Sequence, residues 1–242
     1  MRIYISADME GVSGVVHSEQ TAPGAREYDR ACSLMLGEVN AAIAGAYEGG
    51  ATMVLVNDSH WNMRNLNLLE LDPRAELISG STKPLSMMQD IDTGFDGACF
   101  VGYHARAGTA AASIDHTYTG QIFRVEVNGR ELGELGLNSL LAGSFAVPPI
   151  MATGDQQLVA EARELLGESL VTVQVKTAIG RNAARCLSVA EARRRIQAGA
   201  RAAVERLGKQ ADSAATGAGI TKHPGRHLHE DRSGRASGAG AG

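Results

Sequence analysis

The sequence has few aromatic residues, few cysteines and little positive charge, and each shortage excludes a class of protein. Aromatic residues make up 4% of the chain and the formal net charge is -4, so it lacks the stacking side chains and the basic stripe of nucleic-acid-binding proteins. The three cysteines, Cys32, Cys99 and Cys186, are odd in number and form no CxxC pair, which argues against a disulfide framework and a cysteine zinc knuckle. We therefore expect no nucleic-acid partner and a reducing, cytoplasmic location.

Long apolar runs are also missing. No segment reaches the roughly 20 apolar residues of a membrane span, and the apolar stretch before Asp8 is too short for the core of a signal peptide. We expect no membrane partner and no export. The 242 residues are 44% hydrophobic, which is enough for a sizeable core.

Short apolar runs alternate with segments of helical periodicity along most of the chain. Such alternation is typical of a mostly parallel sheet with helices on both faces, a three-layer doubly wound α/β fold. The expected strands span residues 2–6, 52–56, 75–79, 97–101, 147–152 and 170–176, and the expected helices span residues 27–48, 84–90, 134–145, 156–166 and 189–207.

Two regions depart from this alternation. Phe123, Val125 and Val127 alternate with polar residues and are followed by Asn128-Gly129, a strong hairpin signal because both residues accept positive φ. We expect an inserted β-hairpin there. Residues 208–242 are dominated by glycine, alanine, serine and charged residues, so we divide the chain into an α/β domain at 1–207 and a disordered tail at 208–242.

Polar side chains follow three of the expected strands. Asp8 and Glu10 come after the first, Asp58 and His60 after the second, and His104 after the strand at 97–101. Ligands of open parallel sheets bind beyond the carboxyl ends of the strands. Each residue alone has a structural explanation, such as a helix cap for Asp58 or a hydrogen-bonded core residue for either histidine.

Together, these carboxylates and imidazoles make a ligand set that suits zinc or another first-row divalent ion. Residues i and i+2 of an extended segment point the same way, so Asp8 and Glu10 can share one metal, or one of them can bridge two. Bridged pairs of ions about 3.5 to 4 Å apart are used in metal-assisted hydrolysis.

Two further candidates lie later in the chain. Glu134 opens an expected helix, where an acidic residue also complements the helix dipole. His116 lies on the loop that leads into the hairpin, and its position alone does not separate a catalytic residue from a surface one.

Four sequence blocks carry a family resemblance. SADMEGVSG at 6–14, VNDSH at 56–60, GYHARA at 102–107 and GELGLN at 133–138 resemble the zinc-dependent D-aminopeptidases of the DppA type, in the same order and with similar spacing over residues 1 to about 206. The resemblance implies removal of N-terminal D-amino acids, typically D-alanine, from short peptides. It also implies ring-like homo-oligomers, and a smaller C-terminal subdomain that residues 208–242 leave incomplete.

The resemblance further implies a site with a pair of zinc ions in each subunit. Asp8 would be the bridging carboxylate, Asp58 would have a supporting or capping role, and His116 would act beside the metals. The implied ligands are Asp8, Glu10, His60, His104 and Glu134.

Other functions remain open from the residues. A dinuclear metal phosphoesterase uses similar ligands. An inactive metal-binding protein would keep the ligands without catalysis. Gly11-Val12-Ser13-Gly14 after a strand can also cradle a phosphate, which would make a nucleotide-binding module, although its spacing matches neither a P-loop nor a dinucleotide fingerprint.

Overall fold

The computed structural model describes residues 1–218. Its main feature is a seven-stranded sheet in the order β3-β2-β1-β4-β7-β8-β9, parallel except for the β8/β9 pair. The strands are β1 (Arg2–Ala7), β2 (Met53–Asp58), β3 (Ala75–Ile78), β4 (Gly97–Val101), β7 (Pro149–Asp155), β8 (Val171–Gly180) and β9 (Ala183–Cys186).

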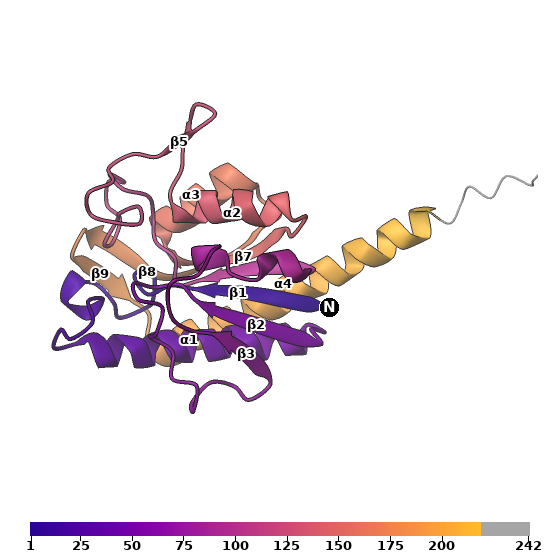
Figure 1. Ribbon diagram of the computed structural model, residues 1–242, viewed down its shortest axis with the longest axis horizontal. Helices are drawn as coiled ribbons and strands as arrows, with labels where there is room; N and C mark the ends of the chain where they lie inside the picture. The colour runs from indigo at the N-terminus through magenta and orange to yellow at the C-terminus, as the bar shows by residue number, and fades with distance from the viewer. Residues whose placement is uncertain (219–242) are drawn as a thin grey trace, which may run out of the picture.

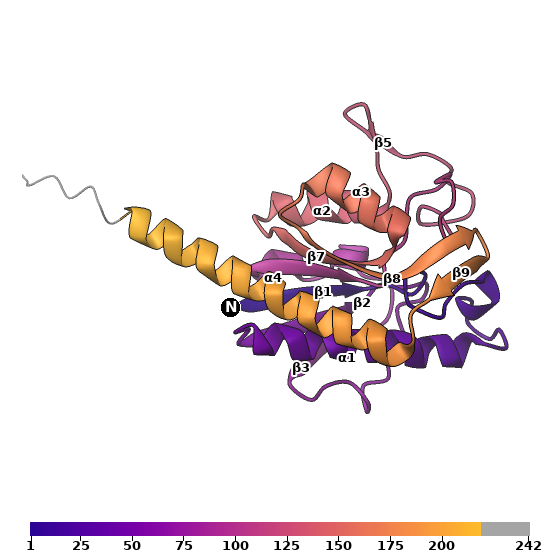
Figure 2. The ribbon, with the colours of Figure 1, turned by 180° about the vertical axis from the view of Figure 1, so that it is seen from behind.

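The sheet is covered on both faces. Helices α1 (Tyr28–Glu48) and α4 (Val189–Ala218) pack against each other on one face, and α2 (Glu134–Ser144) and α3 (Gln156–Leu166) cover the other (Figures 1 and 2). A Cβ at Gly45 would lie 2.1 Å from the backbone oxygen of Gln197, so the lack of a side chain there allows α1 to approach α4 closely. The three-layer, mostly parallel α/β prediction is confirmed.

Three adjacent strands, β2, β1 and β4, explain where polar side chains can converge. β1, β2 and β4 are apolar runs buried over almost their whole length, as expected for strands covered on both faces. Ala7 at the end of β1 pairs with Asp58 of β2 and with Val101 of β4. The carboxyl ends of these strands therefore meet at one edge, where the strand order switches direction.

The predicted hairpin is present as β5 (Glu126–Val127) and β6 (Arg130–Glu131), which form a separate two-stranded sheet. Asn128 and Gly129 have φ values of 52° and 78°, the positive values that a two-residue hairpin turn requires. Figure 1 shows the hairpin projecting beyond the main sheet.

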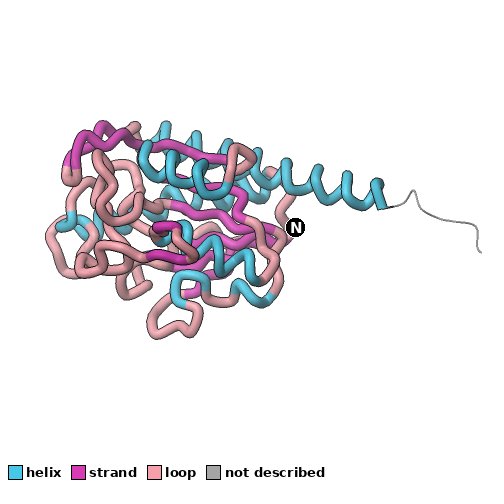
Figure 3. The backbone as a smooth tube through the Cα atoms, turned by 90° about the horizontal axis from the view of Figure 1, so that it is seen from above, coloured by secondary structure: helices cyan, strands magenta, loops and turns pink. Residues whose placement is uncertain are grey.

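Three elements differ from the sequence expectations. The helix expected at 84–90 is only a short 3-10 helix, η2 (Ser86–Met88), because Ser86 and Asp90 have positive φ. β9 was not expected. α4 continues past Leu207 to Ala218. Figure 3 shows this end of α4 extending past the sheet.

The tail expected at 208–242 thus begins as helix. Residues 219–242 lie outside the described part of the chain. Two more 3-10 helices, η1 (Ser18–Gln20) and η3 (Ile91–Thr93), lie in loops. No helix among residues 1–218 combines the length and apolarity needed to cross a membrane.

Glu38 of α1 is a buried carboxylate that ties the helix to the loop after β1. Its Oε1 atom accepts a hydrogen bond of 2.9 Å from the Ser13 amide. Burial raises the pKa of Glu38 from 4.5 to about 7, against the opposing effects of that hydrogen bond and of Lys176. The folded protein therefore binds a proton at Glu38 over a pH range in which the unfolded chain has lost it.

This difference predicts a pH-dependent effect of Glu38→Gln on stability. The folded-state pKa is above the unfolded value, so the wild type loses stability as pH rises from 4.5 through about 7. The variant lacks this loss, and its free energy of unfolding relative to wild type should rise by on the order of 3 kcal/mol between pH 4 and pH 8. Urea unfolding at both pH values measures the change. The exposed Glu164→Gln is the control, and a constant difference across pH would contradict the prediction.

Candidate metal centre

All six candidate residues converge at the carboxyl edge of the central strands. Asp8 and Glu10 follow β1, His60 follows β2 and His104 follows β4. Glu134 is the first residue of α2, and His116 lies on the loop before the hairpin. Five of them are nearly inaccessible to solvent, and His116 is partly buried; those five are Asp8, Glu10, His60, His104 and Glu134.

The first group of ligand atoms is formed around His60. Its Nδ1 atom lies 3.2 Å from Asp8 Oδ1 and 3.1 Å from Glu10 Oε2. The two carboxylates share this neighbour, but not for the reason expected from an extended strand. β1 ends at Ala7 and the following residues turn, with the Val12 amide bonded to the Met9 carbonyl at 3.1 Å.

The second group is formed around His104. Its Nε2 atom lies 3.5 Å from Asp8 Oδ2 and 3.3 Å from Glu134 Oε1. Asp8 therefore offers one oxygen to each group. The ligand atoms of Asp8, Glu10 and His60 lie within 4.8 Å of one another, and the same holds for those of Asp8, His104 and Glu134.

Backbone carbonyls fix which nitrogen of each histidine faces the carboxylates. His60 Nε2 lies 2.7 Å from the Thr21 carbonyl and His104 Nδ1 lies 3.0 Å from the Ala105 carbonyl. A carbonyl only accepts, so these nitrogens donate, and the opposite ring nitrogen of each histidine is left toward the carboxylates. This arrangement is typical of metal-ligating histidines.

Buried atoms without a hydrogen-bond partner fit a bound cation. Asp8 Oδ2, Glu10 Oε2 and His104 Nε2 are buried and make no hydrogen bond within the described residues. Carboxylate oxygens and an imidazole nitrogen facing one another need protons or metal ions between them, since unpaired buried charge is costly. The donor set of oxygen and nitrogen atoms fits zinc.

When metal is absent, protons would lie between the carboxylates and the imidazoles, and the pKa shifts of these groups follow from their mutual contacts. Burial alone lowers the pKa of a histidine, but the facing carboxylates outweigh it, raising the pKa of His60 well above its usual value and that of His104 to about 10. Burial, and then the charge of Glu10, raises the pKa of Asp8 to about 7. Burial acts the same way on Glu10, but the charge of His60 reverses it and lowers the Glu10 pKa. Metal binding at this site would release protons.

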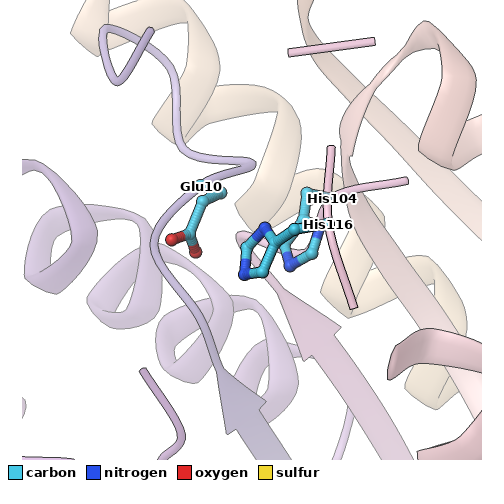
Figure 4. Close-up of side chains that lie close together, drawn as sticks. All are labelled: Glu10, His104 and His116. Atoms are coloured by element: carbon cyan, nitrogen blue, oxygen red, sulfur yellow. The ribbon is translucent and has the colours of Figure 1, made fainter. Parts of the chain in front are cut away.

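His116 stacks on His104, with ring centroids 4.0 Å apart and an interplanar angle of 8°. Figure 4 shows the two rings overlapping, with the Glu10 carboxylate next to them. His116 Nδ1 lies 2.9 Å from the Ile114 carbonyl, to which it donates, and Nε2 lies 3.7 Å from Glu134 Oε1. Burial, and then the positive charge of His104, lowers the His116 pKa.

Asp58 lies outside the cluster and organises the loop that carries His60. Its carboxylate accepts hydrogen bonds from the amides of Asn65 and Leu66, at 2.5 and 2.8 Å, and from the Asn65 side chain at 2.7 Å. The Asn65 side chain also donates to the His60 carbonyl at 2.7 Å. Asp58 thus caps a loop, in agreement with the role expected for it.

The glycines after β1 allow two loops that carry candidate metal ligands to come into contact. The Gly11 amide donates to the Gly102 carbonyl at 2.7 Å, and a Cβ at Gly11 would lie 1.9 Å from the Tyr103 backbone oxygen. The amides of Gly11, Val12 and Ser13 are all bonded within the protein. They are not free to cradle a phosphate, which argues against the nucleotide-binding interpretation.

Lys176 of β8 stabilises the same loop by hydrogen bonds from its side chain. Its buried ammonium group donates to three backbone carbonyls, those of Glu10, Val12 and Val15. No motif in the sequence points to Lys176. The available signal is a lysine at the end of the apolar run expected as a strand at 170–176, near the carboxyl edge of a parallel sheet, where functional residues are expected.

Replacement of Lys176 by methionine should therefore loosen the loop that carries Glu10. Methionine keeps most of the volume but leaves the three carbonyls without their donor, and the free energy of unfolding should fall by about 3 kcal/mol. Chemical denaturation of the metal-free protein measures the change. Lys209→Met, on the exposed surface of α4, is the control. Equal stability of the two variants would show that the lysine contributes little.

A cavity of about 340 Å³ opens beside the cluster. Its volume is at the small end of the range for ligand pockets, about 300 to 1,000 Å³. Charged and apolar side chains both line it, including Asp8, Glu10, His60, Trp61, Ile114, His116, Tyr118, Glu134 and Arg181. A small ligand with both polar and apolar groups fits such a lining.

The sequence profile of the D-aminopeptidase family matches residues 1–221. The chain belongs to this family. This D-aminopeptidase family member is 44% identical over 194 residues to the D-aminopeptidase of Bacillus subtilis (strain 168), an alignment that covers 80% of this chain and 70% of the relative.

A solved structure agrees with the sequence match. The Zn-dependent D-aminopeptidase DppA from Bacillus subtilis, described as a self-compartmentalizing protease, superposes with a TM-score of 0.81 at 41% identity. The match covers 88% of this family member and 75% of that chain. Membership of the family identifies the chain as an aminopeptidase-type hydrolase.

Proposed function

We propose that this chain is a zinc-dependent D-aminopeptidase that removes the N-terminal residue, D-alanine in particular, from short peptides at a dinuclear site. One observation carries the proposal. The two carboxylate oxygens of Asp8 face two separate histidines, with Oδ1 3.2 Å from His60 Nδ1 and Oδ2 3.5 Å from His104 Nε2. The zinc dependence and the D-specificity are those of the Bacillus relative.

The residues divide into two ligand sets that share one carboxylate. Asp8, Glu10 and His60 would hold one zinc ion, and Asp8, His104 and Glu134 would hold the second. Zinc bound there would supply Lewis acidity and a nucleophilic water at neutral pH. The carbonyls of Thr21 and Ala105 would keep the two histidines in the ligating tautomer.

His116 would transfer a proton to the leaving amine. Its Nδ1 donates to the Ile114 carbonyl, so Nε2 is the nitrogen free to exchange protons. The lowered pKa leaves the ring neutral near pH 7, able to accept a proton at Nε2 and pass it to the leaving amine. Its stacking on His104 holds the ring beside the ligands.

The proposal is tested by metal analysis together with an activity screen. Protein with full zinc occupancy should release D-alanine from D-alanyl-D-alanine and much less alanine from L-alanyl-L-alanine. Chelation should remove the activity and added zinc should restore it. Hydrolysis of p-nitrophenyl phosphate without hydrolysis of D-peptides would overturn the proposal in favour of a phosphoesterase.

We also propose that the chain assembles as a homo-oligomer. The Bacillus relative is described as a self-compartmentalizing protease, which requires several subunits to enclose a space. Exposed apolar side chains suit such contacts, with Leu69 94%, Phe123 77% and Ile179 74% exposed. Sedimentation of the full chain at several concentrations tests the assembly, and a monomer at all of them would contradict it.

A further inference from the structure

We propose that Arg181 binds the terminal carboxylate of a short peptide, and that the site is therefore selective for dipeptides with a free carboxyl end. The inference rests on the proposed peptidase function and adds the group that recognises the far end of the substrate. Arg181 lies in the turn between β8 and β9, beyond the four sequence blocks of the family resemblance.

The charges that line the cavity are unequal. Among the described residues around it, the carboxylates of Asp8, Glu10 and Glu134 are negative, and Arg181 is the only lysine or arginine. A dipeptide carries an ammonium group at one end and a carboxylate at the other. The acidic residues are the proposed zinc ligands at the reacting end of the substrate, and among the described residues the carboxylate end has one guanidinium group, that of Arg181.

The guanidinium group is held in place with one edge free. Arg181 Nη1 donates to the carbonyl of Asp115 at 2.6 Å and also to its carboxylate. Within the described residues, Nε and Nη2 have no hydrogen-bond acceptor. These two nitrogens form one of the two edges with which an arginine binds a carboxylate through parallel hydrogen bonds.

Hydrogen bonds also fix the Arg181 backbone and its partner Asp115 next to His116, the candidate catalytic residue. The Arg181 carbonyl accepts a hydrogen bond of 2.9 Å from the Ile114 amide, and the Asp115 carboxylate is itself fixed by the Gly108 amide at 2.7 Å. Asp115 directly precedes His116. The side chain of Arg181 is 55% exposed and that of Asp115 10%, so the arginine is the member of the pair that a ligand can reach.

The size of the cavity sets the length of the peptide. At about 340 Å³, it is at the small end of the range for ligand pockets. Arg181 lines the same small cavity as His116 and the acidic residues. Few atoms therefore fit between the scissile bond and the terminal carboxylate of the peptide. A dipeptide meets this limit, and a long peptide places its carboxylate elsewhere.

The test compares D-alanyl-D-alanine with its C-terminal amide, which lacks only the negative charge. In the wild type, kcat/KM for the amide should be about 10- to 100-fold lower, mainly through KM. Arg181→Gln should lower kcat/KM for the free acid by the same factor and leave that for the amide unchanged. Arg185→Gln, which makes the same charge change on β9 outside this cavity, should change neither.

The outcomes separate the possible roles. An equal loss for acid and amide in Arg181→Gln would mean that Arg181 only supports the loop at Asp115, and would overturn the inference. Equal hydrolysis of acid and amide by the wild type would overturn it without any variant. Failure to hydrolyse either compound, at full zinc occupancy, would instead overturn the proposed peptidase function.

Discussion

Replacing Asp8 by alanine should abolish peptide hydrolysis, with kcat/KM at least about 10,000-fold lower. The reason is geometric, because the two oxygens of Asp8 face the two histidine-centred groups separately. Removal of one side chain takes a ligand from both groups at once. Steady-state kinetics on D-alanyl-D-alanine and the zinc content after gel filtration measure the two effects together.

Loss of activity through unfolding is distinguishable from this effect. The pKa of Asp8 is raised to about 7, by burial and then by the Glu10 carboxylate, so ionised Asp8 destabilises the metal-free protein as pH rises through that value. Metal-free Asp8→Ala should therefore keep or exceed the wild-type Tm at pH 8. The exposed Glu76→Gln on β3 is the control for the charge change. An Asp8→Ala variant with full zinc content and full activity would contradict the bridging role.

His116→Ala should lower kcat by about 100- to 10,000-fold, the range of general acid-base catalysis, while zinc content stays at the wild-type level. Nε2 of His116 is 3.7 Å from Glu134 and its ring is partly exposed to the cavity, so the residue can be lost without opening the ligand sets. Steady-state kinetics over a range of substrate concentrations separates an effect on kcat from an effect on KM. Zinc analysis of the same sample separates both from a loss of metal.

The pH profile gives an independent check on His116. Burial, the largest cause, lowers its pKa from 6.5 whether or not zinc is bound, so the neutral, proton-accepting ring persists to pH values below 6.5. Wild-type kcat should thus remain high at pH 6.5 and fall only at lower pH. A variant that loses zinc together with activity would assign His116 to the ligands, and one that keeps wild-type kcat would remove it from the mechanism.

The central fold was predictable because its signals are local. Buried parallel strands are short apolar runs, and the end of each run places its next polar residues at a shared edge. The convergence of Asp8, His60 and His104 follows from this rule. Helix α3 was expected at the bounds it has, since its periodicity is clear and Asp155 caps it by accepting from the Gln157 and Leu158 amides.

Other features depend on contacts between distant segments and leave little trace in the sequence. β9, which pairs with β8, is a short strand of four partly exposed residues, so it lacks the apolar run by which the other strands were recognised. Asp8 and Glu10 approach His60 through a turn, and that turn depends on the contact of Gly11 with the Gly102 carbonyl. The ammonium group of Lys176 reaches the same turn from a strand more than 160 residues away.

Residues of β8 and of the turn that joins it to β9 complete the candidate site, so residues 1–144 alone do not form all of it. A fragment that ends after α2 contains all six candidate residues, yet it lacks the lysine that holds the Glu10 loop and the arginine that borders the cavity. It also lacks α4, against which α1 packs. The candidate site thus draws its proposed ligands from the amino-terminal blocks, and the residues that support the Glu10 loop and border the cavity from the later strands.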